Sequence, residues 1–84
     1  TDNLLAEVIV KVYYSAQLLK DISSVIEEDE QTNIHAIKKG PPDRDDVLSL
    51  YVTLEVPDLQ TLNQILARLE IIPKVLHARR RVAG

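Results

Sequence analysis

Few side chains in this sequence are of types that carry chemistry. The chain has two histidines, His35 and His77, and no cysteine. Without cysteine there is no thiolate nucleophile, no disulfide framework and no thiolate zinc site. No Ser/His/Asp spacing, glycine-rich phosphate loop or convergent pair of carboxylates is visible either. The sequence therefore predicts no catalytic residue, no metal site and no resident cofactor.

Basic residues form a second group that could bind a ligand. Lys38 and Lys39 are adjacent, and Arg79, Arg80 and Arg81 follow one another near the end of the chain. Such clusters can contact the phosphates of RNA. The alternative is that they are solvated charges of sheet edges, balanced by acidic residues. These acidic residues are Asp43, Asp45, Asp46 and the stretch 27–30.

The composition is that of one small globular domain. The chain has 84 residues, of which 45% are hydrophobic and 27% charged, with a net charge of -3. This length leaves no room for a second domain, so residues 1–84 are expected to form a single unit. The absence of Phe, Trp and Met requires a core of Leu, Ile and Val. No apolar run is long enough for a membrane span and no leader is evident, so a cytoplasmic location is expected.

Hydrophobic periodicity predicts four strands and two helices. Residues 4–12, 32–38, 46–56 and 75–82 are expected as strands, because apolar and polar residues alternate or turn residues bound them. Residues 16–28 and 58–71 show apolar residues at spacings of three and four, which is typical of amphipathic helices. Ser15 and Asp58 are the expected N-caps. Pro41 and Pro42 are expected to end the second strand, since proline cannot donate to a ladder.

This order of elements predicts the α+β, ferredoxin-like βαββαβ fold. Its four-stranded antiparallel sheet has the order 4-1-3-2, and both helices cover one face. His35 and His77 then lie on opposite edges about 14 Å apart, so they are surface histidines or, alternatively, bridge a metal between two copies. Leu76 and Ala78 are expected on the best apolar side of the last strand. The open sheet face is expected to be apolar in patches, which often mark a protein contact. The residues of these patches are Ile9, Ile37, Tyr51 and Val75.

Several segments, in their order and spacing, resemble one known family. The run from Leu18 to Ser23 (LLKDIS) opens the first helix, and Asn33 precedes an aliphatic residue at the start of the second strand. Ile72-Pro73-Lys74-Val75 then leads into a strand rich in arginine. From about Asn3 to Arg80 the chain resembles the ACT domain at the C-terminal end of RelA/SpoT-type (p)ppGpp synthetase/hydrolases.

The first turn of the chain departs from the family pattern. ACT domains usually carry Asp-Arg-x-Gly there, and the glycine lets backbone amides approach a ligand. The matching positions here are Tyr14, Ser15, Ala16 and Gln17. The resemblance implies a ligand site at these four residues together with Leu18 and Asn33. An amino-acid ligand is the implied one, at a site altered by the missing acid and glycine.

The resemblance implies a non-catalytic regulatory domain whose parent protein is a GTP pyrophosphokinase. The domain would transmit ligand, partner or ribosome binding to the enzyme domains. Its expected partners are those domains, a second copy in a homodimer, an amino acid, or ribosomal RNA, and no membrane. Two alternatives are an RNA-binding module that uses Arg79, Arg80, Arg81, Lys38 and Lys39, and an amino-acid sensor.

Overall fold

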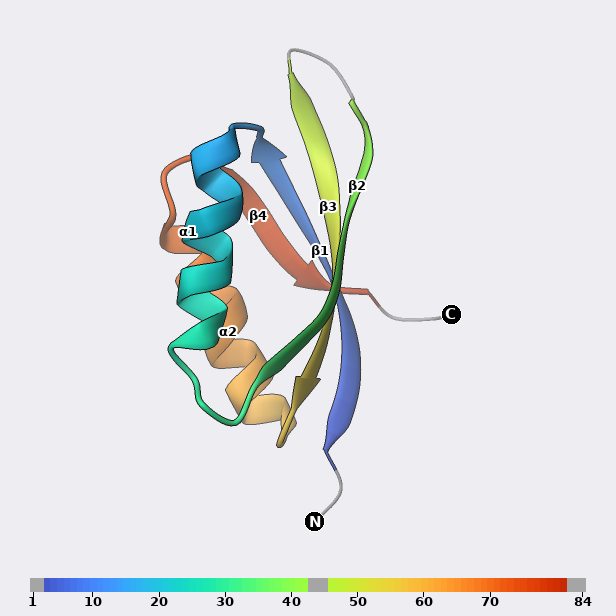
Figure 1. The fold of residues 1–84 in the computed structure, drawn as a ribbon, viewed down its shortest axis with the longest axis vertical. Helices are drawn as coiled ribbons and strands as arrows, with labels where there is room; N and C mark the ends of the chain where they lie inside the picture. Colours follow the sequence, from blue (N-terminus) through green and yellow to red (C-terminus); the bar gives the residue numbers. More distant parts are fainter. Residues whose placement is uncertain (1–2, 43–45, 82–84) are drawn as a thin grey trace.

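Two helices cover one face of a four-stranded antiparallel sheet and leave the other face open (Figure 1). The computed structural model describes residues 3–42 and 46–81. The strand order β2-β3-β1-β4 confirms the predicted ferredoxin-like fold. Val82, the predicted end of the last strand, and the acidic residues Asp43 and Asp45 lie outside the described residues. The elements in order are β1 (Leu4–Tyr13), α1 (Ala16–Glu27), β2 (Asn33–Pro42), β3 (Val47–Val56), α2 (Leu59–Ile71) and β4 (Val75–Arg80).

Both helices begin at the predicted N-caps. The Ser15 hydroxyl accepts a hydrogen bond from the backbone N–H of Leu18 at 3.3 Å, and an Asp58 carboxylate oxygen accepts one from Thr61 N–H at 2.7 Å. Each cap satisfies a backbone donor that has no partner within its helix. The apolar residues then recur on the side that faces the sheet. They are Leu18, Ile22 and Ile26 in α1 and Leu62, Ile65 and Leu69 in α2.

The core lies between these helices and the two central strands. In the β1–β3 register Val8 is opposite Val52 and Val10 is opposite Leu50, and all four are fully buried. Burying one such side chain stabilises the fold by about 1.5–3 kcal/mol before the entropic cost of ordering it. The alternation seen in the sequence places these residues on one face, as predicted.

A bulge in the β1–β4 pairing changes which residues of β4 face the core. Lys11 is opposite His77 but Val12 is opposite Val75, so Leu76 is an additional residue. Val75 and Ala78 are consequently buried, whereas Leu76 is 46% exposed. The prediction that Leu76 shares an apolar side with Ala78 was wrong, as was the prediction that Val75 lies on the open face. The inserted residue breaks the period of two on which both rested.

A second bulge lies in β2. Ile34 is opposite Leu54 and Ile37 is opposite Val52, so both isoleucines lie on the face that carries the helices. Both pack against the core while remaining partly exposed. The prediction that Ile37 lies on the open face was therefore wrong, because one residue is added between Ile34 and Ala36.

The strand β2 also continues past its predicted end at residue 38, as far as Pro42. The register shifts again between Lys39 and Pro42, and Pro42 is opposite Leu48. Proline is compatible with this position because β2 is an edge strand, whose outward N–H groups need no partner in the sheet. The hairpin formed by β2 and β3 projects beyond β1 and the helices (Figure 1).

Candidate functional site

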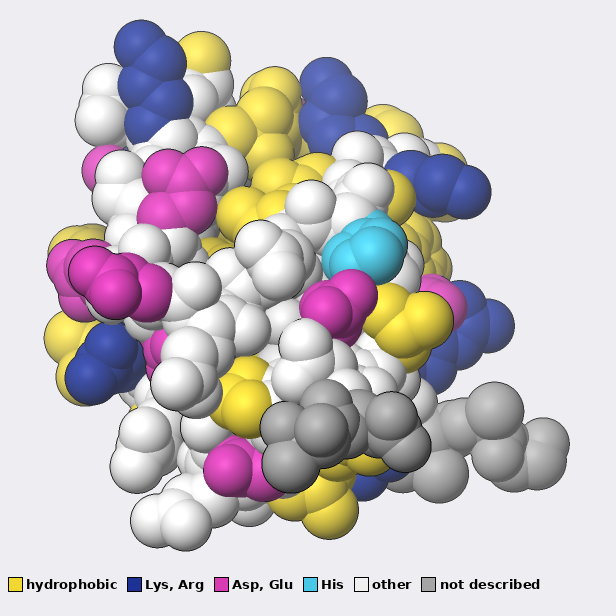
Figure 2. Space-filling model, turned by 60° about the horizontal axis from the view of Figure 1, so that its bottom comes forward, with side chains coloured by type: hydrophobic (Ala, Val, Ile, Leu, Met, Phe, Trp, Pro, Cys, Tyr) yellow, Lys and Arg dark blue, Asp and Glu magenta, His cyan; other side chains and the backbone are white. Residues whose placement is uncertain are grey.

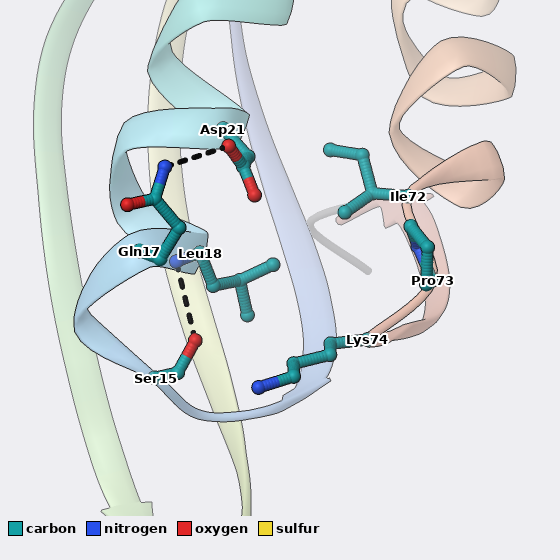
Figure 3. A pocket seen from close by; sticks show the side chains of 7 residues that line it. All are labelled: Ser15, Gln17, Leu18, Asp21, Ile72, Pro73 and Lys74. Atoms are coloured by element: carbon teal, nitrogen blue, oxygen red, sulfur yellow. Dashed lines mark hydrogen bonds between the residues drawn. The ribbon is translucent and has the colours of Figure 1, made fainter.

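A pocket lies between the beginning of α1 and the loop that joins α2 to β4 (Figure 3). Its volume is about 160 Å³. Three predicted ligand-binding residues, Ser15, Gln17 and Leu18, line it. The remaining lining residues, which the sequence analysis did not assign to a ligand site, are Asp21, Ile72, Pro73 and Lys74.

Backbone hydrogen bonds fix the two walls of the pocket next to each other. Tyr13 N–H at the end of β1 donates to the carbonyl of Lys74 at 2.9 Å, and Val75 N–H donates to the carbonyl of Ile72 at 3.0 Å. The loop before β4 is therefore held beside the turn that follows β1. The Ser15 cap sets the direction in which α1 leaves that same turn.

The pocket combines apolar walls with charged groups at its rim. Leu18 is buried, and Ile72 and Pro73 form the wall across from it. Lys74 reaches toward the Ser15–Leu18 turn, and its ammonium group forms no ion pair with another described residue (Figure 3). Asp21 lies one turn along α1, where its carboxylate accepts a hydrogen bond from Gln17 Nε2 at 3.3 Å. A cation and an anion beside an apolar wall suit a small ligand that carries both charges.

The other predicted ligand-binding residues lie outside this pocket. Ala16 is exposed at the start of α1. Tyr14 lies against β2, where Lys39 Nζ donates to its hydroxyl at 3.4 Å. Asn33 is opposite Glu55, which is also opposite Leu5, so it lies at the end of the sheet where β1 begins. Tyr14 follows the other end of β1, and one copy of the chain does not bring Asn33 to the pocket.

The basic residues predicted to contact RNA are divided between two edges and two faces of the sheet. Lys38 is opposite Tyr51 on the open face, whereas Lys39 is opposite the buried Leu50 on the helix side of β2. Arg79 and Arg80 alternate in the same way on β4, opposite Ile9 and Val8. On the molecular face in Figure 2, lysine and arginine side chains are separated by acidic, hydrophobic and uncharged ones.

Arg81 differs from its neighbours because it lies over the sheet. Its backbone N–H donates to the carbonyl of Glu7 at 2.7 Å, and its Nη1 donates to Glu7 Oε1 at 2.7 Å. The guanidinium also lies 5.9 Å from the centre of the Tyr51 ring. All three arginines are exposed, and Arg81 is the one whose charge is paired with a carboxylate of the described residues.

The two histidines lie on opposite edges of the sheet, as predicted. His77 is in β4, whereas His35 in β2 lies 2.9 Å from Glu55 through Nε2 and Oε1. Asn3 Nδ2 donates to the other oxygen of Glu55 at 2.7 Å, and the hydrogen bonds from Asn3 and His35 lower the pKa of this carboxyl. Among the described residues there is no cluster of three His, Cys, Asp or Glu side chains that could hold a metal. In the same part of the chain, no helix has the length and apolar character needed to cross a membrane.

Comparisons with known proteins give one family and several similar folds. The family model of the ACT domain matches residues 1–80 of the sequence. The ACT domain from GTP pyrophosphokinase of Chlorobium tepidum is 19% identical with a TM-score of 0.76, over 94% of this chain and 99% of that one. The C-terminal domain of the MgtC protein from Mycobacterium tuberculosis is 18% identical with a TM-score of 0.73, over 94% and 86% of the two chains. Protein HP0495 from H. pylori is 18% identical with a TM-score of 0.70, over 90% and 80%.

No curated protein sequence matches the chain. At the identities of these solved structures the likeness shows the fold alone, and the function has to be argued from the site.

Proposed function

The chain belongs to the ACT domain family, and from this premise we propose that it is the non-catalytic regulatory domain of a (p)ppGpp synthetase/hydrolase. The domain transmits the binding of a ligand or partner to the enzyme domains of its parent protein in the cytoplasm. This proposal is supported by the similarity over nearly the full length of the ACT domain of a GTP pyrophosphokinase.

The observation that carries the proposal is the pocket beside the first turn of α1. It joins the segment in which the family resemblance implied a ligand site with the loop before β4. Lys74 suits a carboxylate, Asp21 suits an ammonium group, and Leu18 with Pro73 leaves an apolar wall for a small side chain. We therefore propose a small α-amino acid as the regulatory ligand.

Regulation by this ligand requires that it bind two states of the parent protein with different affinities. The isolated domain supplies the ligand site. The two states of different affinity come from its contact with a second copy or with an enzyme domain. We propose a homodimer or an interdomain contact in this role.

An amide-shift NMR titration of the domain with each of the twenty amino acids tests the proposal. The expected result is saturable shifts confined to Ser15–Asp21 and Ile72–Lys74. Repeating the spectra at two protein concentrations measures self-association in the same experiment. If no amino acid produces such shifts, the pocket is not an amino-acid site, and concentration-dependent shifts would then assign the domain a purely protein-contacting role.

RNA binding is the second candidate function, and the exposed Arg79 and Arg80 on the β4 edge favour it. Binding of this kind weakens steeply as salt is raised, because counterions are released from the phosphates. Arg79→Gln and Arg80→Gln would then weaken binding more than Arg81→Gln, since Arg81 is already paired with Glu7. Binding to a ribosomal RNA fragment that is insensitive to both salt and these substitutions would exclude this role.

A further inference from the structure

We infer that Tyr14 couples occupancy of the pocket to the position of the β2–β3 hairpin. This inference rests on the proposed function, because it takes the pocket to be a regulatory site. Tyr14 directly precedes Ser15, which both caps α1 and lines the pocket. The side chain of Tyr14 itself contacts the hairpin, so one short turn joins the pocket to the hairpin.

Three contacts connect Tyr14 to the hairpin. Lys39 Nζ donates to the Tyr14 hydroxyl at 3.4 Å and lies 4.5 Å from the centre of its ring. The backbone N–H of Tyr14 donates to the carbonyl of Asp46 at 3.4 Å. Tyr14 is thus held by β2 through its side chain and by the residue before β3 through its backbone. A partly buried ring beside an ammonium group gains from both the cation–π attraction and the hydrogen bond.

The hairpin is packed so that a movement of Lys39 would also move its neighbours in β2 and β3. The next residue, Gly40, lies directly against the ring of Tyr51 and the carbonyl of Ser49. A chain packed this tightly moves with its neighbours, because protein interiors and close contacts have little free space. The β2–β3 register shifts between Lys39 and Pro42, so the ladder is interrupted directly beside the residue that Tyr14 contacts.

The consequence is a defined output surface for the pocket. The hairpin projects beyond β1 and the helices (Figure 1), and Lys38, Lys39, Pro41 and Pro42 of its β2 strand are exposed. A ligand that changes the Ser15–Leu18 turn would change how tightly Tyr14 holds Lys39. By thermodynamic linkage, the factor by which a pocket ligand changes the affinity of the hairpin for a partner equals the factor by which that partner changes the affinity of the pocket for the ligand.

The test places a chemical group at the rim of the pocket without relying on a natural ligand. Because the chain has no cysteine, Gln17→Cys creates a single thiol at the pocket rim. Methyl methanethiosulfonate converts this thiol to a mixed disulfide that occupies the rim, and dithiothreitol removes the group again. Amide chemical shifts are compared before labelling, after labelling and after reduction, in the full chain.

The expected result is a reversible shift of the Lys38, Lys39 and Gly40 amides on labelling. In the Tyr14→Phe and Lys39→Met backgrounds this shift should fall by about twofold or more, since each removes part of the connecting contact. Lys38→Met is the matched control, because Lys38 is adjacent but faces the open side of the sheet opposite Tyr51. In that background the labelling shift should be unchanged.

Two outcomes overturn the coupling: hairpin amides that do not respond to labelling, or a response that Lys38→Met reduces as much as Lys39→Met does. Neither outcome depends on whether an amino acid binds. The titration with amino acids can therefore fail while the labelling experiment succeeds, and the two proposals are tested separately.

Discussion

Gly40 and Tyr51 are packed against each other across the β2–β3 hairpin. A Cβ atom at Gly40 would come within 2.9 Å of Tyr51 Cε2 and 3.0 Å of the carbonyl oxygen of Ser49. The aromatic ring therefore lies where any other residue would place its side chain. This contact lies in the part of β2 where its register on β3 shifts.

Gly40→Ala is expected to destabilise the domain by about 1–3 kcal/mol, as overpacking does elsewhere. The added methyl group must displace the Tyr51 ring and press on the Ser49 carbonyl, which as a backbone atom does not move easily. Urea unfolding followed by circular dichroism measures the change. In a Tyr51→Leu background the penalty should be smaller by about 0.5 kcal/mol or more, since the rigid ring is gone. An equal penalty in both backgrounds would assign the effect to the Ser49 carbonyl alone.

The Asp58 cap should make stability depend on acid pH. Hydrogen bonds from the backbone and side chain of Thr61 lower the pKa of Asp58 from its usual 3.8. A carboxyl whose pKa is lower in the folded state stabilises that state fully above its unfolded pKa, and this contribution is lost as the pH falls through the folded value. We expect Asp58→Ala to be less stable than the parent chain near neutral pH.

Asp58→Asn is the matched control for this cap. Asparagine caps helices about as well as aspartate but does not titrate. Its stability in urea should therefore stay close to that of the parent chain near neutral pH and decline less between about pH 5 and pH 2. If Asp58→Asn loses stability in acid as steeply as the parent chain, Asp58 is not the group responsible.

The strands and helices were predictable because their signals are local. The alternation of Val8, Val10 and Val12 specifies a buried strand, and Ser15 and Asp58 are capping residues beside amphipathic runs. A bulge has no such signal, because it adds one residue to a strand without changing the residue types around it. The two bulges for this reason moved Val75 and Ile37 from the predicted open face to the core side.

The sequence predicted only some of the residues that line the candidate site. Ser15, Gln17 and Leu18 lie in the turn that the family resemblance pointed to, and they do line the pocket. Lys74 lies far along the chain and reaches the pocket because β4 pairs with β1, which is a property of the topology and not of any motif. Asn33 shows the converse, since a residue matched by its motif lies at the other end of the sheet.

Asn3 and His35 are both expected to affect the titration of Glu55. The hydrogen bond from Asn3 is the largest single cause that lowers the pKa of Glu55, and His35 lowers it through its hydrogen bond and its charge. Asn3→Ala and His35→Ala should therefore each raise the Glu55 pKa toward its usual 4.5. A carbon-detected NMR titration of the glutamate carboxyl groups measures both shifts. A Glu55 pKa that neither substitution changes would show that these contacts do not persist in solution.

Lys74 should decide whether the pocket binds a carboxylate. Lys74→Met keeps the length and apolar stem of the side chain but removes its charge, so an amino acid found to bind should lose about 1.5–3 kcal/mol of binding free energy, as for a charged hydrogen bond. Lys20→Met is the control, because Lys20 is an exposed lysine of α1 that does not line the pocket. Isothermal titration calorimetry with the parent chain and both variants measures the affinities.

The two variants should have the same stability in urea, which separates a loss of binding from a loss of folding. Equal affinities for Lys74→Met and Lys20→Met would show that the carboxylate is held elsewhere, and the α2–β4 loop would then be only a wall of the pocket.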